Sequence, residues 1–209
     1  MLKSRFSQAD IPLAPDFQNP VWMEAGWKPI STQWNGNPVD QQWTTRFASR
    51  WTASHLYFAF DCRFLQMTAA QVPQRAAKTH HLWDLEDVVE IFLSPEIAQL
   101  ECYREFELSP SGQWIDIDID HTSGRTDFEW QSGMAGCSQV DQNQRSWKAV
   151  MQIPLRAFEP TAIQTGLTVG LNAYRVELKS NLYLAWNPTL TSKPDFHVPR
   201  RFGRMVFTN

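Results

Sequence analysis

The sequence predicts an all-β fold: a two-sheet antiparallel β-sandwich, immunoglobulin-like or jelly-roll-like, with short helices in its loops. Apolar residues alternate with polar ones along several short segments, turn-forming residues separate these segments, and no long stretch keeps the 3.6-residue apolar rhythm of a helix. The 209 residues contain no repeat, low-complexity tract or break in composition, so we expect one domain over residues 1–209.

The first predicted hairpin joins residues 43–51 to residues 56–64. Along the second segment the even positions are Leu, Phe, Phe, Cys and Phe, whereas the odd positions are Tyr, Ala, Asp and Arg. This period of two predicts a strand with one buried face and one mixed face. The four residues between the segments are enough for a tight connection.

A second hairpin is predicted from residues 103–109 and 113–120, because Pro110-Ser111-Gly112 favours a turn between them. The remaining strand candidates are residues 88–93, 146–153, 168–176, 182–186 and 204–207. Short helices are expected at residues 68–71 and 155–158. Long loops are expected at residues 64–81 and 124–137.

Composition excludes several classes of function. The formal net charge is −3, and a nucleic-acid binder needs clustered cations, so we expect no nucleic-acid partner. No run of 18 apolar residues occurs, so we expect no membrane partner. The three cysteines form no CxxC motif, which predicts free thiols. Free thiols, and the lack of an apolar segment after the first basic residues, favour the cytoplasm but do not fix the compartment.

Residues 116–120 have the D-x-D-x-D spacing that begins a calcium loop. The residues between the aspartates are isoleucines, and the sixth position, which such a loop gives to glycine, is His121. The alternation therefore predicts a strand with an acidic outer face. We expect no cofactor, and a bound calcium ion has no assignable ligands in the sequence.

An acidic cluster with a tryptophan just ahead of it, residues 83–90, is the most informative segment. Trp83 could simply pack, with the acids solvated; alternatively, the segment forms an aromatic and polar rim at a sheet end. A sugar ring has an apolar C–H face and an edge of hydroxyls, so such a rim suits it. Glu90 and Glu107, on neighbouring strands, could instead be the carboxyl pair of a glycan-processing enzyme.

Three motifs resemble carbohydrate-binding family 9, within the DOMON-like group of β-sandwiches. They are D-V-V-E-I-F at residues 87–92, G-L-N-A-Y-R-V at 170–176 and P-R-R-F-G at 199–203, and residues 56–60 and 153–155 are also similar to the family. The resemblance spans nearly the whole chain. It implies a non-catalytic module that binds the end of an oligosaccharide or polysaccharide, and thus no catalytic residues.

The resemblance also implies site residues. Family members that bind sugar clamp it between two tryptophans, whose positions match Trp83 and Phe196, and the glutamate that bonds hydroxyls matches Glu90. Other expected contacts are Glu107, which replaces a cation, Ser109, Asn172, and Tyr174, which replaces a glutamine.

The DOMON-like group suggests a second interpretation, a haem-binding redox domain. Its ligands would come from His80 or His81 together with Met67 or Met134. Isolated histidines are more often structural or solvated, which favours the sugar interpretation.

Overall fold

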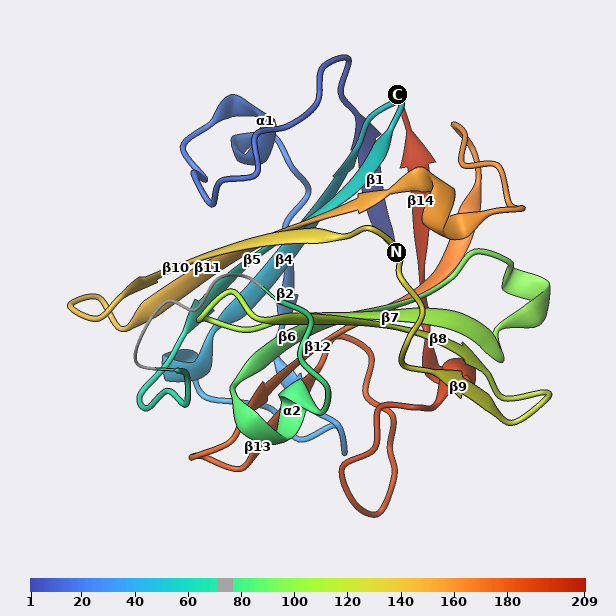
Figure 1. Ribbon diagram of the computed structural model, residues 1–209. Helices are drawn as coiled ribbons and strands as arrows, with labels where there is room; N and C mark the ends of the chain where they lie inside the picture. Colours follow the sequence, from blue (N-terminus) through green and yellow to red (C-terminus); the bar gives the residue numbers. More distant parts are fainter. Residues whose placement is uncertain (71–76) are drawn as a thin grey trace.

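The computed structural model describes residues 1–70 and 77–209, which form mainly β-strands (Figure 1). The strands are β1 (Leu2–Phe6), β2 (Lys28–Ile30), β3 (Thr32–Gln33), β4 (Thr45–Trp51), β5 (His55–Arg63), β6 (Val88–Ser94), β7 (Cys102–Leu108), β8 (Trp114–Asp120), β9 (Arg125–Asp127), β10 (Ala135–Asp141), β11 (Ser146–Pro154), β12 (Thr168–Glu177), β13 (Leu182–Ala185) and β14 (Gly203–Thr208). The short helices are α1 (Pro20–Met23), α2 (Leu82–Leu85), η1 (Gln41–Trp43), η2 (Ile97–Gln99), η3 (Leu155–Phe158) and η4 (Pro199–Arg201). None of the helices in these residues is long and apolar enough to span a membrane.

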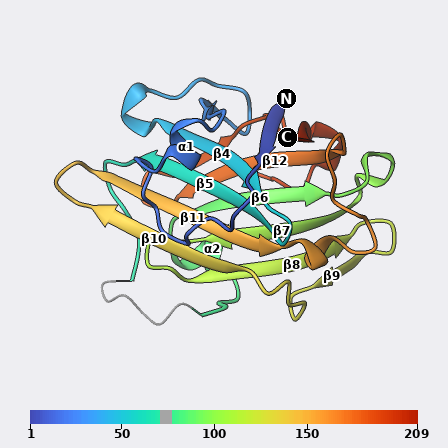
Figure 2. The same cartoon turned by 90° about the horizontal axis from the view of Figure 1, so that it is seen from above.

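Most of the strands follow one hydrogen-bonded path that curls into two facing layers, and β2, β3 and β13 pair beside it (Figure 2). The path runs β10-β11-β5-β4-β1-β14-β12-β6-β7-β8-β9. The predicted β-sandwich is confirmed, with one difference in connection. Strand β1 is parallel to both β4 and β14 and joins the two layers, whereas the prediction kept two separate antiparallel sheets.

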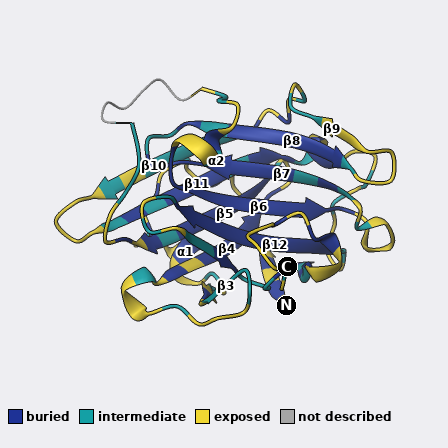
Figure 3. Cartoon of the chain, turned by 90° about the horizontal axis from the view of Figure 1, so that it is seen from below, coloured by how far each residue is buried: buried dark blue, intermediate teal, exposed yellow. Residues whose placement is uncertain are grey.

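The main core lies between the two layers, and both contribute buried strands to it (Figure 3). Phe47 and Phe60 stack in the layer of β4 and β5, with ring centroids 5.8 Å apart. Phe106 of β7 packs from the other layer. The mixed face of β5 is also covered, because Tyr57 packs against the segment that carries Trp22 of α1.

Both predicted hairpins are confirmed, as β4–β5 and β7–β8. Gly112 provides the second turn with a left-handed φ of 88°, a conformation that glycine adopts without a steric penalty. The helix expected at 155–158 is η3, whereas residues 68–70 are not helical and Gln71 lies outside the described residues.

The long loop predicted at 124–137 is wrong, because β9 and the start of β10 lie there. Strand β10 ends the hydrogen-bonded path, and an edge strand needs no strict alternation of apolar residues. Gly136 lets it approach the core closely: a Cβ at this position would lie 2.6 Å from Cδ1 of Leu108.

The acidic outer face predicted for residues 116–120 is also wrong, although these residues are in the strand β8. Asp116 is fully buried, where it accepts a hydrogen bond from Nζ of Lys78 at 2.6 Å and two from Ser132. Asp118 is held by Arg104 and Arg125. The partners of Asp116, Lys78 and Ser132, stand 38 and 16 residues away in the sequence, which is why the alternation alone suggested a solvated face.

Candidate functional site

A second apolar cluster covers the face of β12, β6, β7 and β8 that points away from the main core. It includes Phe92, the isoleucines of β8, and Tyr174. A cavity of about 670 Å³ opens over this face, walled by α2, by the segment after β9 and by residues 193–197. This volume is within the range of small-molecule sites, roughly 300–1,000 Å³.

Trp83 lies in one wall of the cavity. His81, with a left-handed φ of 54°, precedes α2, and the helix then presents Trp83 as a half-buried ring. The ring makes an edge contact with His81 at a centroid distance of 5.2 Å and lies 6.5 Å from Phe128 at a tilt of 31°. The aromatic surface on this side therefore consists of two neighbouring rings.

Phe196 lines the same cavity, ahead of η4. It is 9% exposed and stacks flat on Tyr174, with ring centroids 4.1 Å apart and an interplanar angle of 11°. The hydroxyl of Tyr174 donates to the carbonyl oxygen of Phe196 at 3.1 Å. One face of the Phe196 ring is thus backed by protein, and the residue borders the open space.

Three glutamates lie together in the cavity lining. Glu90 of β6 pairs directly with Glu107 of β7, and Glu105 shares the face of Glu107 because side chains alternate along a strand. Each is at most 3% exposed, and one carboxylate oxygen from each lies within 4.8 Å of the others. Such oxygens are ligands that a hard metal cation prefers, so these residues could also hold an ion.

Burial sets the charge of this cluster. It raises the pKa of Glu90 and Glu107 well above the ordinary value, and the neighbouring glutamates raise both further. Burial also raises the pKa of Glu105, while His197 opposes that change. A hydrogen bond between Glu105 and Glu107 lowers the pKa of Glu105 and raises that of Glu107.

The structure brings four of the seven predicted site residues to this cavity: Trp83, Glu90, Glu107 and Phe196. The other three lie outside its lining. Asn172 is fully buried and donates to the hydroxyl of Tyr174 at 2.7 Å, so both support the wall behind Phe196. Ser109 is at the β7–β8 turn, where its hydroxyl bonds that of Ser111 at 3.0 Å.

Sequence reasoning missed several lining residues. Glu105 had a usable signal, because it stands two residues before Glu107 on the same strand. His121 and His197 had none, since their convergence depends on the fold. The hydroxyl of Tyr103 lies 2.8 Å from Nδ1 of His197 and 3.3 Å from Nε2 of His121.

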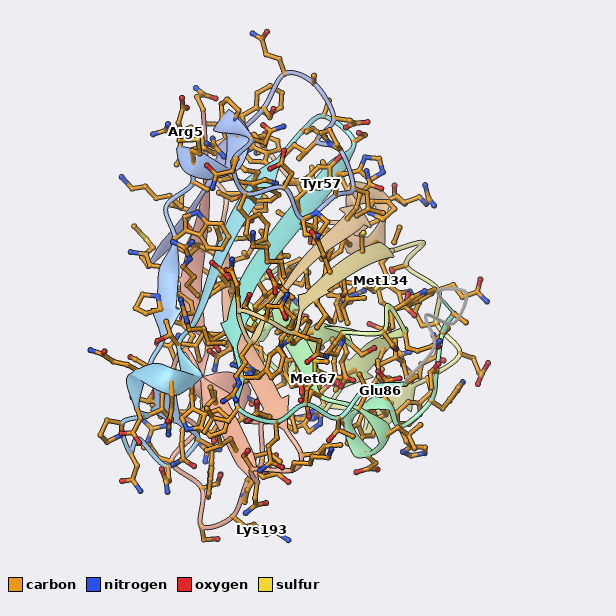
Figure 4. The ribbon with its side chains drawn as sticks, turned by 90° about the vertical axis from the view of Figure 1, so that its left-hand side faces the viewer. Arg5, Tyr57, Met67, Glu86, Met134 and Lys193 are labelled. Carbon is orange, nitrogen blue, oxygen red and sulfur yellow. The ribbon has the colours of Figure 1, made fainter. Side chains whose placement is uncertain are left out.

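The residues proposed for a haem do not converge. Met134 is buried in the core between the layers, and Met67 packs against that core. His80 and His81 instead lie beside Phe128 at the cavity. Figure 4 also shows Met134 well separated from Lys193, a residue of the cavity lining.

Comparison with known proteins identifies the class of this β-sandwich. The model of carbohydrate-binding family 9 matches residues 65–207, more than half of the sequence. The chain therefore belongs to carbohydrate-binding family 9. No curated protein matches it.

Solved structures agree with the fold. A presumed carbohydrate-binding protein from Bacteroides uniformis is similar over 99% of this chain and 98% of its own, with a TM-score of 0.79 and 20% identity. A family 9 module from Caldicellulosiruptor kristjanssonii in complex with glucose gives 0.65 at 11% identity, covering 99% and 96% of the two chains. The same kind of module in complex with cellotriose gives 0.66 at 12%, covering 100% and 93%.

Proposed function

We propose that this protein binds carbohydrate without catalysing a reaction, holding the end of an oligosaccharide or polysaccharide between Trp83 and Phe196. The observation that carries the proposal is that both rings, predicted from the sequence as a clamp, line one cavity together with Glu90 and Glu107. The aromatic faces would cover the apolar C–H faces of a sugar, and the carboxyl groups would bond its hydroxyls.

Membership of family 9 and the named complexes with glucose and cellotriose support a sugar ligand. Family 9 is a family of carbohydrate-binding modules, and this membership favours binding over hydrolysis.

The experiment is a calorimetric titration of the whole chain with cello-, xylo- and manno-oligosaccharides. Trp83→Ala removes a half-buried ring of the cavity, so binding should weaken by more than about 2 kcal/mol, roughly 30-fold, while the fold is retained. Trp27→Ala is the matched control, because Trp27 is equally half-buried but packs near α1 against Phe17 and Trp22.

We expect the control to bind like the natural chain. Absence of binding to any glycan would overturn the proposed function. Equal binding by the Trp83 variant and its control would remove the clamp.

A further inference from the structure

The three glutamates of the cavity carry no cationic partner. In the described part of the chain, no lysine or arginine forms an ion pair with Glu90, Glu105 or Glu107. Lys193, the lysine of the cavity lining, lies at the far end of its loop (Figure 4). His197 lowers the pKa of Glu105 and so acts against the effect of burial.

Two oxygens of this cluster lack a donor from any other side chain. Among the described residues, Oε2 of Glu105 and Oε2 of Glu107 are buried and have no hydrogen-bond partner. Both side chains are at least 97% buried and line the cavity. A buried carboxylate without a partner is costly, so these groups either hold protons or are satisfied by a donor that enters from the cavity.

The spacing of the oxygens fits an ammonium group. Three acceptors placed about 2.8 Å from one tetrahedral nitrogen lie about 4.6 Å from each other. One carboxyl oxygen from each of the three glutamates lies within 4.8 Å of the others, so the cluster is compact enough for one nitrogen to reach all three. An ammonium has three N–H donors and no acceptor, so it can bond all three carboxyls at once and replace the protons that burial favours.

The rest of the cavity indicates what carries this ammonium. A bare ion would fill a small part of about 670 Å³ and would leave Trp83 and Phe196 without a contact. A ligand with a flat apolar face and an amine fits both the rings and the acids. An amino sugar has this combination on a single ring.

We propose that Glu90, Glu105 and Glu107 form an ammonium subsite that directs this cavity toward amino sugars with a free amine. This inference rests on the proposed function and narrows its substrate class. A glucosamine oligomer is the expected ligand. Its N-acetylated and its hydroxyl counterparts lack the charge and should bind more weakly.

The test compares three trimers that differ only in the C2 substituent of each ring: glucosamine trimer, N-acetylglucosamine trimer and cellotriose. Calorimetry on the whole chain near neutral pH should give an affinity for the glucosamine trimer at least about tenfold above the other two, because charge-assisted hydrogen bonds are the stronger kind. Glu105→Gln should reduce this preference while binding of cellotriose persists. Asp120→Asn, a change at the partly exposed end of β8, is the control and should keep the preference.

The possible outcomes separate the two proposals. Equal or weaker binding of the glucosamine trimer would overturn the ammonium subsite and leave the sugar site standing. No binding of any trimer would overturn both.

A further series with calcium chloride or a chelator tests the cluster as a metal site: if calcium strengthens binding of cellotriose and weakens that of the glucosamine trimer, the ammonium assignment is wrong. The ligand comparison needs no variant, so it holds even where a glutamine variant fails to fold.

Discussion

Replacing Phe196 by alanine or leucine separates the stability that this residue gives from its contact with a sugar. Phe196 is 9% exposed and stacks on Tyr174 at 4.1 Å. Burial of a phenylalanine typically contributes about 3–5 kcal/mol against alanine. Because Phe196 borders the cavity, the space left by alanine would merge with it rather than form a closed void. We therefore expect a loss near the lower end, about 3 kcal/mol.

Leucine keeps most of the volume of Phe196 but has no flat face. It should cost about 1–2 kcal/mol, from imperfect packing and from the lost ring stack on Tyr174. Urea unfolding measures this loss of stability. Calorimetry with the tightest-binding oligosaccharide measures the loss of sugar affinity, which we expect to be about tenfold, ~1.4 kcal/mol. A leucine variant that loses stability and yet binds as tightly as the natural chain would show that Phe196 packs the wall and contacts no sugar.

Two further predictions concern buried acids. Burial raises the pKa of Glu90, Glu105 and Glu107, so these groups favour the folded state below the ordinary glutamate pKa of 4.5, and this stability is lost as pH rises through their folded pKa values. The free energy of unfolding in urea should thus fall as pH rises, and Glu107→Gln should flatten the fall; parallel curves would contradict this account. Arg175 is fully buried and donates a hydrogen bond to Glu177 at 3.0 Å; burial raises the pKa of Glu177 to about 7 against the opposing charge of Arg175. Arg175→Met should cost about 3–5 kcal/mol, increasingly so as pH rises through the pKa of Glu177, and a loss under about 1 kcal/mol at high pH would refute it.

The hairpins were predictable because their signals are local. The alternation of residues 56–64 and the turn at Pro110-Ser111-Gly112 depend on neighbours in the sequence. Strand β1 was missed because its five residues gain their pairing from β4 and β14, which are distant in the chain. Strand β10 was missed because Gly136 and its small neighbours carry no apolar rhythm.

The candidate site was predictable only in part. The family motif at residues 83–92 pointed to Trp83 and Glu90, and the motif at residues 199–203 pointed to Phe196. The fold brings these three residues to one cavity. Asn172 and Tyr174 are instead buried behind the cavity wall. The sequence could not show this, because alternation along a strand assigns a residue to a face but does not give its depth. Glu105 could have been inferred from its position two residues before Glu107, whereas its closeness to Glu90 depends on the register of β6 and β7.

The most direct test of the sugar-binding account is a crystal structure of the protein with its tightest-binding oligosaccharide. The account predicts one sugar ring between Trp83 and Phe196, with hydroxyl or amine groups directed at Glu90 and Glu107. A sugar bound elsewhere on the molecule, or a cavity closed by the protein's own side chains, would contradict it.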